Sequence, residues 1–369
     1  MTINEKFGLK HVINASGKMT ILGVSKVSDT VAAAQKEAGQ SFFEMSDLME
    51  KTGYYVAKLL GTENATIVSS ASAGIAQAVA AVIGQGDSYA LYHPYASRIS
   101  RREIILPKGH NVDYGTGVQV MVEVGGGKVV EAGWANMCSA EHIEMEITDN
   151  TAAILYIKSH HTVQKSMLTV EQAAAVAHKH HLPLIVDAAA EEDLHKYYEM
   201  GADLVIYSGA KAIEAPASGL VAGKDELIKW VQLQSKGVGR CMKIGKDNVV
   251  ALVQAIEEYL ANGSESRESQ EQRLLPFIQA VNEIPGLEAK EVQDGAGREI
   301  FRAAVKVTSA AAKTAYTVVA ALKEGDTAVY TREYQVNNGI IEFDIRAVTA
   351  EELTVIENKL EKIMRGNEK

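Results

Sequence analysis

An aspartate, a lysine and a run of small residues each lie where a short apolar segment ends. Asp187 ends the apolar segment LPLIVD, and Lys211 lies shortly after the next one, DLVIYS. Residues 69–74, SSASAG, follow the strand-like segment NATIV. In open parallel sheets, ligands bind beyond the carboxyl ends of the strands, so we expect these three features to meet in one site.

The three features together fit one cofactor. A turn of small residues from a strand into a helix lets backbone N–H groups and the helix dipole hold a phosphate. An aspartate at a strand end can pair with a protonated pyridine nitrogen, and a lysine one strand later can bond to an aldehyde. Pyridoxal 5'-phosphate (PLP) requires these groups. We therefore expect Lys211 to carry PLP and act as a general base, and Asp187 to keep the cofactor's ring protonated.

Each feature also has a purely structural alternative. A lysine taken alone is typical of a surface loop, and Asp187 could cap the helix that follows it. Many tight strand-to-helix turns are rich in Ser, Ala and Gly without binding a ligand. Their shared order along the chain favours the PLP site.

The hydrophobic pattern predicts the elements that position these residues. Apolar segments alternate with amphipathic or Ala-rich ones, and Thr169 and Gln172 have the spacing of a capping box at a helix start. A helix is expected over residues 192–200, closed by Gly201. This alternation predicts an α/β fold with a mostly parallel sheet covered on both faces. The expected strands are residues 64–70, 102–107, 152–158, 182–187 and 203–208.

The pattern changes after Val249. A long helical segment is followed by two alternating, strand-like segments and an amphipathic closing helix, which predicts a smaller α+β domain on an antiparallel sheet. The expected organisation is a segment packing with the small domain at 1–50, a large PLP-binding domain at 51–250 and a small C-terminal domain at 251–369.

The composition limits the class of protein. Apolar residues make up 47% and charged residues 23%, and the net charge is −10, so we expect a globular protein without a broad nucleic-acid-binding face. Two distant cysteines, the lack of a signal-type N-terminus and the lack of a long apolar stretch predict a soluble, cytoplasmic protein without contact to a membrane. His178, His180 and His181 end a predicted helix without matching ligands, so no metal site is expected.

Several motifs resemble those of a known superfamily. VINASGK near the start, LPKGHNVDYGTG, IVDAAA, IYSGAKAIEAPASGLVAGK and GRCMKIGKDNVVALVQAIEEY are similar to segments of the bacterial selenocysteine synthase superfamily of fold-type I PLP enzymes. The resemblance runs from about Val12 to Leu260 and implies the fold-type I PLP-dependent transferase fold, with active sites at subunit interfaces of a homodimer or higher oligomer.

The resemblance also implies roles for individual positions. Lys211 would be the lysine bonded to PLP and Asp187 the partner of its ring nitrogen. His110 would stack on the cofactor, although it could be an ordinary polar loop residue. His160 or, preferably, His161 would reach the cofactor's O3' side, the alternative being a core histidine. The expected phosphate cradle is Ser72, Ala73, Gly74 and Ser208.

Two basic segments are candidates for binding the substrate. GRCMKIGK contains Arg240, Lys243 and Lys246 in a glycine-containing loop, and arginine binds phosphate in a bidentate manner. Arg346 in FDIRAV lies on a strand of the small domain. Related enzymes hold the substrate carboxylate there, but a surface arginine is an equal alternative.

The expected function is PLP-dependent α,β-elimination. Within the superfamily the chain is similar to the ammonia-lyases that act on phosphorylated amino sugar acids, which implies D-glucosaminate 6-phosphate as substrate and a 2-keto-3-deoxy acid and ammonia as products. One alternative is selenium or sulfur transfer, or lyase chemistry on another amino acid. Another is a cofactor-binding regulator without turnover. The net charge of −10 and the early start of VINASG argue against a tRNA substrate.

Overall fold

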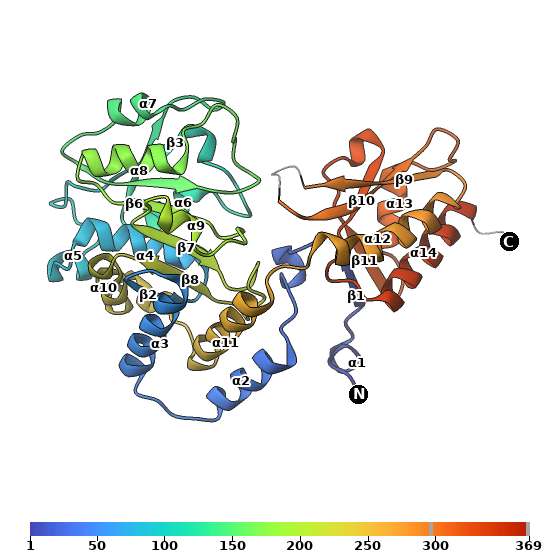
Figure 1. Ribbon diagram of the computed structural model, residues 1–369, viewed down its shortest axis with the longest axis horizontal. Coiled ribbons are helices and arrows are strands. Elements are labelled where there is room, and N and C mark those ends of the chain that lie inside the picture. The colour runs from blue at the N-terminus through green and yellow to red at the C-terminus, as the bar shows by residue number, and fades with distance from the viewer. Residues whose placement is uncertain (295–297, 367–369) are drawn as a thin grey trace. The chain divides into compact units, whose positions relative to one another are not determined.

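The chain folds as two compact units. The structure, a computed structural model, describes residues 1–294 and 298–366. One unit combines Met1–Lys26 with Ser264–Lys369, and the other is Val27–Gly263 (Figure 1). These bounds differ from the expected ones at 50 and 250, because helix α2 (Asp29–Gly39) packs against α11 (Lys246–Asn262).

The larger unit is built on a mixed, mostly parallel sheet. In the described part of the chain the strand order is β2-β8-β7-β6-β5-β3-β4. Strand β8 is antiparallel to both of its neighbours, and the remaining pairs in the sheet are parallel. This confirms the expected α/β class. The strands are β2 (Asn64–Val68), β3 (Glu103–Pro107), β4 (Lys128–Ala132), β5 (Thr151–Ile157), β6 (Leu184–Asp187), β7 (Leu204–Ser208) and β8 (Gly219–Gly223).

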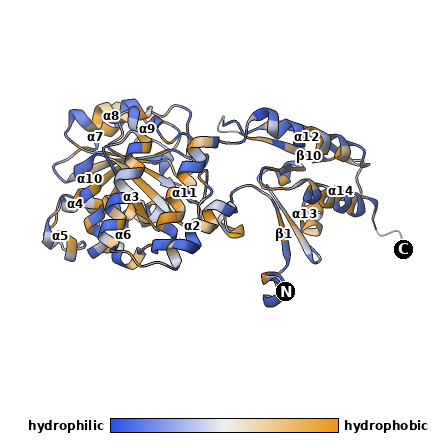
Figure 2. Ribbon diagram, turned by 60° about the horizontal axis from the view of Figure 1, so that its bottom comes forward, coloured by the Kyte–Doolittle hydropathy of each residue, from blue (hydrophilic) through white to orange (hydrophobic). Residues whose placement is uncertain are grey.

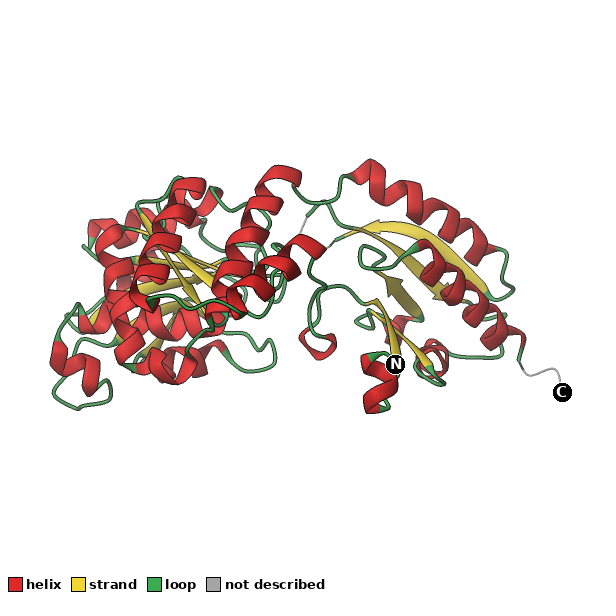
Figure 3. Ribbon diagram, turned by 90° about the horizontal axis from the view of Figure 1, so that it is seen from below, coloured by secondary structure: helices red, strands yellow, loops and turns green. Residues whose placement is uncertain are grey.

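Helices cover both faces of this sheet (Figure 3). Successive residues of β6 alternate between two cores: Val186 packs in one hydrophobic cluster and Ile185 in the other. The strands therefore bury apolar side chains on both faces, and Figure 2 shows the hydrophobic colour of the central strands. Each fully buried aliphatic side chain contributes about 1.5–3 kcal/mol. One core contains residues of α3 (Met45–Leu60), α7 (Ala140–Met145), α8 (Val170–Lys179), α9 (Lys196–Glu199) and α11, and the other of α4 (Ala71–Gly84), α6 (Val118–Val124) and α10 (Asp225–Leu233).

Hydrogen bonds to nearby side chains set the starts of helices α8 and α9. Thr169 and Gln172 form the predicted capping box of α8. Helix α9 is shorter than the expected helix over 192–200, because the Asp193 carboxylate accepts the N–H groups of His195 and Lys196 and the helix begins only there.

The smaller unit is an α+β structure, as expected. In its described residues, β10 (Phe301–Val307) lies between β12 (Ile340–Phe343) and β9 (Leu287–Gln293), and both pairs are antiparallel. A separate parallel pair joins β1 (His11–Ala15) to β11 (Thr327–Thr331). The helices of the unit are α1 (Ile3–Phe7), α12 (Arg267–Asn282), α13 (Ala315–Leu322) and α14 (Ala350–Arg365).

A buried ion network lies inside the smaller unit. Arg302, whose side chain is 3% exposed, donates to Asp294 and to Asp344. Burial alone would raise the pKa of Asp344, but Arg346 and Arg302 lower it to about 2. Asp344 is therefore ionised at neutral pH and is stabilised by both guanidinium groups.

Among the described helices, none is both long enough and apolar enough to cross a membrane.

Candidate active site

Two neighbouring strand ends bring Asp187 and Lys211 to the same edge of the sheet. Strands β6 and β7 are parallel, and Asp187, the last residue of β6, pairs with Ile206 of β7. The chain leaves β7 at Ser208 and turns at once, because the N–H of Lys211 donates to the Ser208 carbonyl at 3.3 Å. The charge of Lys211 is close enough to lower the pKa of Asp187. The predicted pair is therefore placed together at the carboxyl edge.

A folded-back loop holds the lysine turn in place. Residues 209–218 return to the end of β7, with the Gly209 N–H donating to the Ser218 carbonyl at 2.9 Å. A side chain at residue 209 would lie 2.1 Å from the Ser218 hydroxyl. The glycine is therefore required for this close approach, and Lys211 is part of a packed turn and not of an open surface loop.

Asp187 is a buried carboxyl group, and its side chain lies near the charge of Lys211. Burial raises its pKa to about 6, against the lowering effects of Lys211 and of the Ala189 N–H, which donates to Oδ1 at 3.0 Å. Glu191 raises it further. The helix-cap alternative is wrong, since the following helix α9 has His195 at its cap position. A positively charged group beside Asp187 would lower this pKa.

Helix α4 begins at the same edge of the sheet, directly after β2. Ser70 caps it: its hydroxyl accepts the Ala73 N–H at 3.0 Å, and its carbonyl accepts the Gly74 N–H at 2.9 Å. As at any helix start, the N–H groups of Ala71 and Ser72 have no carbonyl partner within the helix. They and the Ser72 hydroxyl are the better candidates for a phosphate site, whereas the N–H groups of Ala73 and Gly74 already have partners.

Glycines let other elements approach this helix start closely. A Cβ atom on Gly219 of β8 would lie 2.5 Å from the Ser70 carbonyl carbon, and one on Gly74 would lie 3.0 Å from the Ile206 side chain. Gly74 thus packs α4 against β7. Its expected binding role stays a prediction beside this structural one.

The predicted histidines lie in contrasting environments. His110 is fully buried, with its ring edge-on to Tyr156 at 4.5 Å between centroids. Burial lowers its pKa to about 4, and its Nε2 has no hydrogen-bond partner among the residues described. His110 is therefore not a polar surface residue, but a cofactor could stack on it only if covering residues moved. His160 and His161 are exposed, with ring centroids 4.0 Å apart, so neither is a core histidine.

The basic segment GRCMKIGK is divided between two roles. Arg240 lies in the exposed part of η4 (Val238–Met242), and Lys243 is exposed just after it. Gly239 packs directly on Gln77 of α4. Lys246 instead donates to the carbonyl groups of Ala38 and Gly39 in the last turn of α2 and of Ser41 just beyond it. Lys246 thus caps a helix, while Arg240 and Lys243 stay predicted anion-binding residues.

Arg346 belongs to the smaller unit. Its guanidinium group donates to both carboxylate oxygens of Asp344 at 2.9 Å, and its side chain is only 18% exposed. Arg346 lies in a turn after β12 and not on the expected strand, and it is a half-buried, ion-paired arginine and not a freely exposed one. Its role in binding a carboxylate stays a prediction.

Sequence analysis assigned no role to Tyr114. Its hydroxyl oxygen is buried and makes no hydrogen bond within the described part of the chain, and its pKa is affected by both Asp187 and Ser72. Tyr114 thus lies near both ends of the predicted PLP site. Its place directly before the Gly115-Thr116-Gly117 segment of HNVDYGTG was the available signal.

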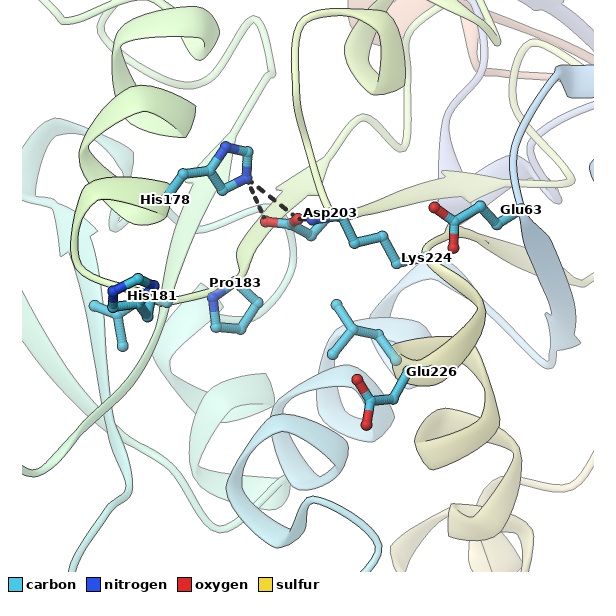
Figure 4. Close-up of a pocket in the computed structure, with 9 residues that line it drawn as sticks. Glu63, His178, His181, Pro183, Asp203, Lys224 and Glu226 are labelled. Carbon is cyan, nitrogen blue, oxygen red and sulfur yellow. Dashed lines mark hydrogen bonds and ion pairs between the residues drawn. The ribbon is translucent and has the colours of Figure 1, made fainter.

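A pocket of about 480 Å³ lies at the opposite edge of the sheet (Figure 4). Its floor is Asp203, just before β7, which accepts hydrogen bonds from His178 and from the Leu184 N–H and pairs with Lys224. These contacts join α8, β6, β7 and the end of β8. The pocket is remote in the fold from the carboxyl edge, and we assign Asp203 a structural role. No group of three or more potential metal ligands is found in the described residues.

The residues at the carboxyl edge fit PLP. A buried aspartate can hold a protonated ring nitrogen, a lysine follows the next strand, and a helix N-terminus with a nearby unpartnered hydroxyl can hold a phosphate.

Comparisons with known proteins find similar chains along nearly the whole sequence. A family model described as "SelA: L-seryl-tRNA selenium transferase" matches residues 13–315. A D-glucosaminate-6-phosphate ammonia lyase from Salmonella typhimurium is 45% identical over 98% of this chain and 97% of its own length. A solved structure titled "Structure of D-Glucosaminate-6-phosphate Ammonia-lyase" has 44% identity and a TM-score of 0.93, covering 99% of this chain and 98% of its own.

Two less similar proteins show how far the scaffold extends. A 5'-C-glycyluridine monooxygenase-decarboxylase from a Streptomyces species is 34% identical over 98% of this chain and 91% of its own length. An aspartate aminotransferase from Thermus thermophilus, with 15% identity and a TM-score of 0.55 over 97% of this chain and 93% of its own, shares the fold alone.

Asp187→Asn should stabilise the cofactor-free protein at neutral pH. The folded-state pKa of about 6 exceeds the ordinary value of 3.8, so the folded state binds more protons between these values and stability falls as pH rises through them. Asparagine avoids this loss, which is on the order of 3 kcal/mol at about 1.4 kcal/mol per pKa unit. Urea unfolding should show little difference between variant and wild type at pH 4 and the full gain at pH 8.

Asp193→Asn is the control for this prediction, since Asp193 is exposed. It should show no gain that grows with pH. An Asp187→Asn protein no more stable than wild type at pH 8 would mean that the buried carboxylate is not destabilised as described.

Proposed function

The chain belongs to the SelA (L-seryl-tRNA selenium transferase) family, and we propose that within this family it is a PLP-dependent ammonia-lyase. Its proposed reaction converts D-glucosaminate 6-phosphate to 2-keto-3-deoxygluconate 6-phosphate and ammonia. The observation that carries the proposal is the pair of Asp187 and Lys211 at adjacent strand ends. The similarity to an ammonia lyase along nearly the whole chain supports the choice of substrate. Selenium transfer and a regulator without turnover are not better supported.

Different residues of the chain are proposed for cofactor binding and for proton transfer. Bound PLP supplies an electron sink for the bond broken at the substrate's Cα. Asp187 holds the proton on the ring nitrogen, and the start of α4 with Ser72 and Ser208 binds the cofactor phosphate. Lys211 would hold the cofactor covalently, and the substrate's amine would displace it. The freed Lys211 amine would then remove the Cα proton and could return a proton to the departing C3 hydroxyl. Water lost at C3 is recovered when the released enamine hydrolyses to the 2-keto acid and ammonia.

A phosphorylated substrate requires a second anion site. The start of α4 is used for the cofactor, so another cationic group must bind the substrate phosphate. Arg240 and Lys243 are exposed cations on a segment packed against α4, which supports this role. Arg346, oriented by Asp344, is proposed for the substrate carboxylate. His110 and His161 are proposed to stack on the cofactor and to approach its O3' side.

We further propose that the protein is a homodimer or a higher oligomer in the cytoplasm. Phe42 is 99% exposed and is followed by the partly exposed Phe43 and Met45, an apolar cluster of a kind that oligomers bury. Light scattering at micromolar concentration should give at least twice the 39.8 kDa chain mass. A fully active monomer would contradict the proposal. Cell fractionation tests the location.

Borohydride treatment of the PLP-loaded protein should fix the cofactor to Lys211. Lys211 follows β7 beside Asp187, whereas Lys224 is ion-paired to Asp203 at the opposite edge. Peptide mass mapping should find the adduct on Lys211, and Lys211→Ala should lose it together with turnover. An adduct on Lys224 or Lys229, with Lys211 unmodified, would overturn the assignment.

Arg240→Ala should weaken binding of the phosphorylated substrate selectively. The lost contact between charged groups corresponds to about 1.5–3 kcal/mol, or roughly a ten- to hundredfold loss in kcat/KM. The measurement is kcat/KM for ammonia release from D-glucosaminate 6-phosphate and from D-glucosaminate, in wild type and variant. Each assay is run with and without oxygen, because one relative of the chain is a monooxygenase-decarboxylase. Lys236→Ala, at an exposed lysine of η3 (Gln234–Lys236), is the matched control.

Two outcomes would contradict parts of this account. Equal losses on both substrates would show that Arg240 does not contact the phosphate. Ammonia release that requires oxygen would contradict the lyase reaction itself.

A further inference from the structure

Tyr114 is carried by a tightly closed loop after β3. The Val118 N–H donates to the Val112 carbonyl at 3.1 Å, and Asp113 pairs with Gly117 across the loop. The Asp113 carboxylate also accepts the Gly115 N–H at 2.7 Å. Gly115 has φ +112°, a conformation that side chains strongly disfavour. The loop therefore fixes Tyr114 by its own hydrogen bonds and turn chemistry.

The ring of Tyr114 packs against the core on the α4 side of the sheet. Its hydroxyl oxygen is buried, and none of the residues described completes a hydrogen bond to it. A buried hydroxyl without a partner is costly, and most such groups in native proteins have one. An unpaired group of this kind needs an explanation, and a ligand that accepts its hydrogen bond would supply one.

The surroundings of the hydroxyl indicate which ligand atom it faces. The Ser72 hydroxyl, in the first turn of α4, is close enough to lower the pKa of the phenol through a weak polar interaction. The distance and angle of a full hydrogen bond are not met by any described residue. Burial, and secondarily the charge of Asp187, raise that pKa to about 12. Tyr114 is therefore a protonated donor at neutral pH. It lies beside the helix N-terminus that suits a phosphate, while Asp187 accounts for the ring nitrogen.

We propose that the Tyr114 hydroxyl donates a hydrogen bond to the phosphate of bound PLP, beside Ser72 at the start of α4. The proposal rests on the proposed function for the identity of the cofactor. Tyr114 is thus a positioning residue: it holds the phosphate end of the cofactor, and Asp187 holds the opposite end. Its hydroxyl gains its missing partner only when the cofactor binds.

The test is Tyr114→Phe, which removes the hydroxyl and keeps the ring. Cofactor affinity is measured by titrating the cofactor-free protein with PLP and with pyridoxal, which lacks the phosphate. PLP affinity should fall about ten- to hundredfold, as for the loss of a hydrogen bond to a charged group. Pyridoxal affinity should not change. The matched control is Tyr95→Phe, because the exposed Tyr95 hydroxyl donates to the Val124 carbonyl at 2.8 Å and should affect neither affinity.

Thermal unfolding supplies a second readout that does not depend on turnover. Without cofactor, Tyr114→Phe should unfold at the same or a higher temperature than wild type, because the lost hydroxyl had no partner. With saturating PLP, the rise in Tm should be smaller in the variant than in wild type.

Each other outcome overturns the proposal. A lower Tm without cofactor would mean that the hydroxyl is bonded within the protein. Equal losses for PLP and pyridoxal would show that it does not bind the phosphate. Unchanged PLP affinity with lost turnover would place Tyr114 at the substrate instead. Failure of the parent protein to bind PLP at all would refute the proposed function, which is distinguishable from these results.

Discussion

A buried carboxylate at the end of β6 is the constraint on which the rest of the site depends. Asp187 is 5% exposed, and burial raises its pKa to about 6 in the protein alone. An ionised carboxylate in such a place requires a cation or hydrogen bonds. Lys211 and the Ala189 N–H compensate only in part, since the pKa stays raised. A protonated pyridine nitrogen would complete the compensation, so a residue whose buried charge is costly by itself is suited to holding the cofactor.

Strand pairing and close backbone packing place Lys211 and the start of α4 near this carboxylate. Parallel pairing of β6 with β7 places Asp187 beside the turn that carries Lys211. Gly219 lets β8 pass against the Ser70 turn, which brings the start of α4 to the same edge. Two cores, one on each face of the sheet, hold these strands. The positions of the functional groups therefore depend on strand register and on close backbone packing.

Sequence reasoning identified what depends on neighbouring residues in the chain. Strands β2, β3, β5, β6 and β7, the capping box of α8, and the strand-end positions of Asp187 and Lys211 follow from local pattern and spacing. Strands β4 and β8 of the same sheet were not predicted. Side-chain contacts between segments far apart in the chain became known only from the structure. Lys246 caps α2, and Arg346 pairs with Asp344. The hydroxyl of Tyr114 lies near Ser72 and Asp187, and no spacing along the chain predicts that contact. The Ser70 hydroxyl caps α4 by accepting the Ala73 N–H. This contact is between near neighbours in the chain and could have been predicted from the serine before the helix.

The central claim is that Asp187 keeps the cofactor's ring nitrogen protonated. The most direct measurement is the ¹⁵N chemical shift of that nitrogen in protein loaded with ¹⁵N-labelled PLP, recorded at pH 8 for wild type and Asp187→Asn. The account predicts a protonated nitrogen in wild type, because the carboxylate stabilises the pyridinium, and an unprotonated one in the variant. An unprotonated nitrogen in wild type, or the same shift in both proteins, would contradict it.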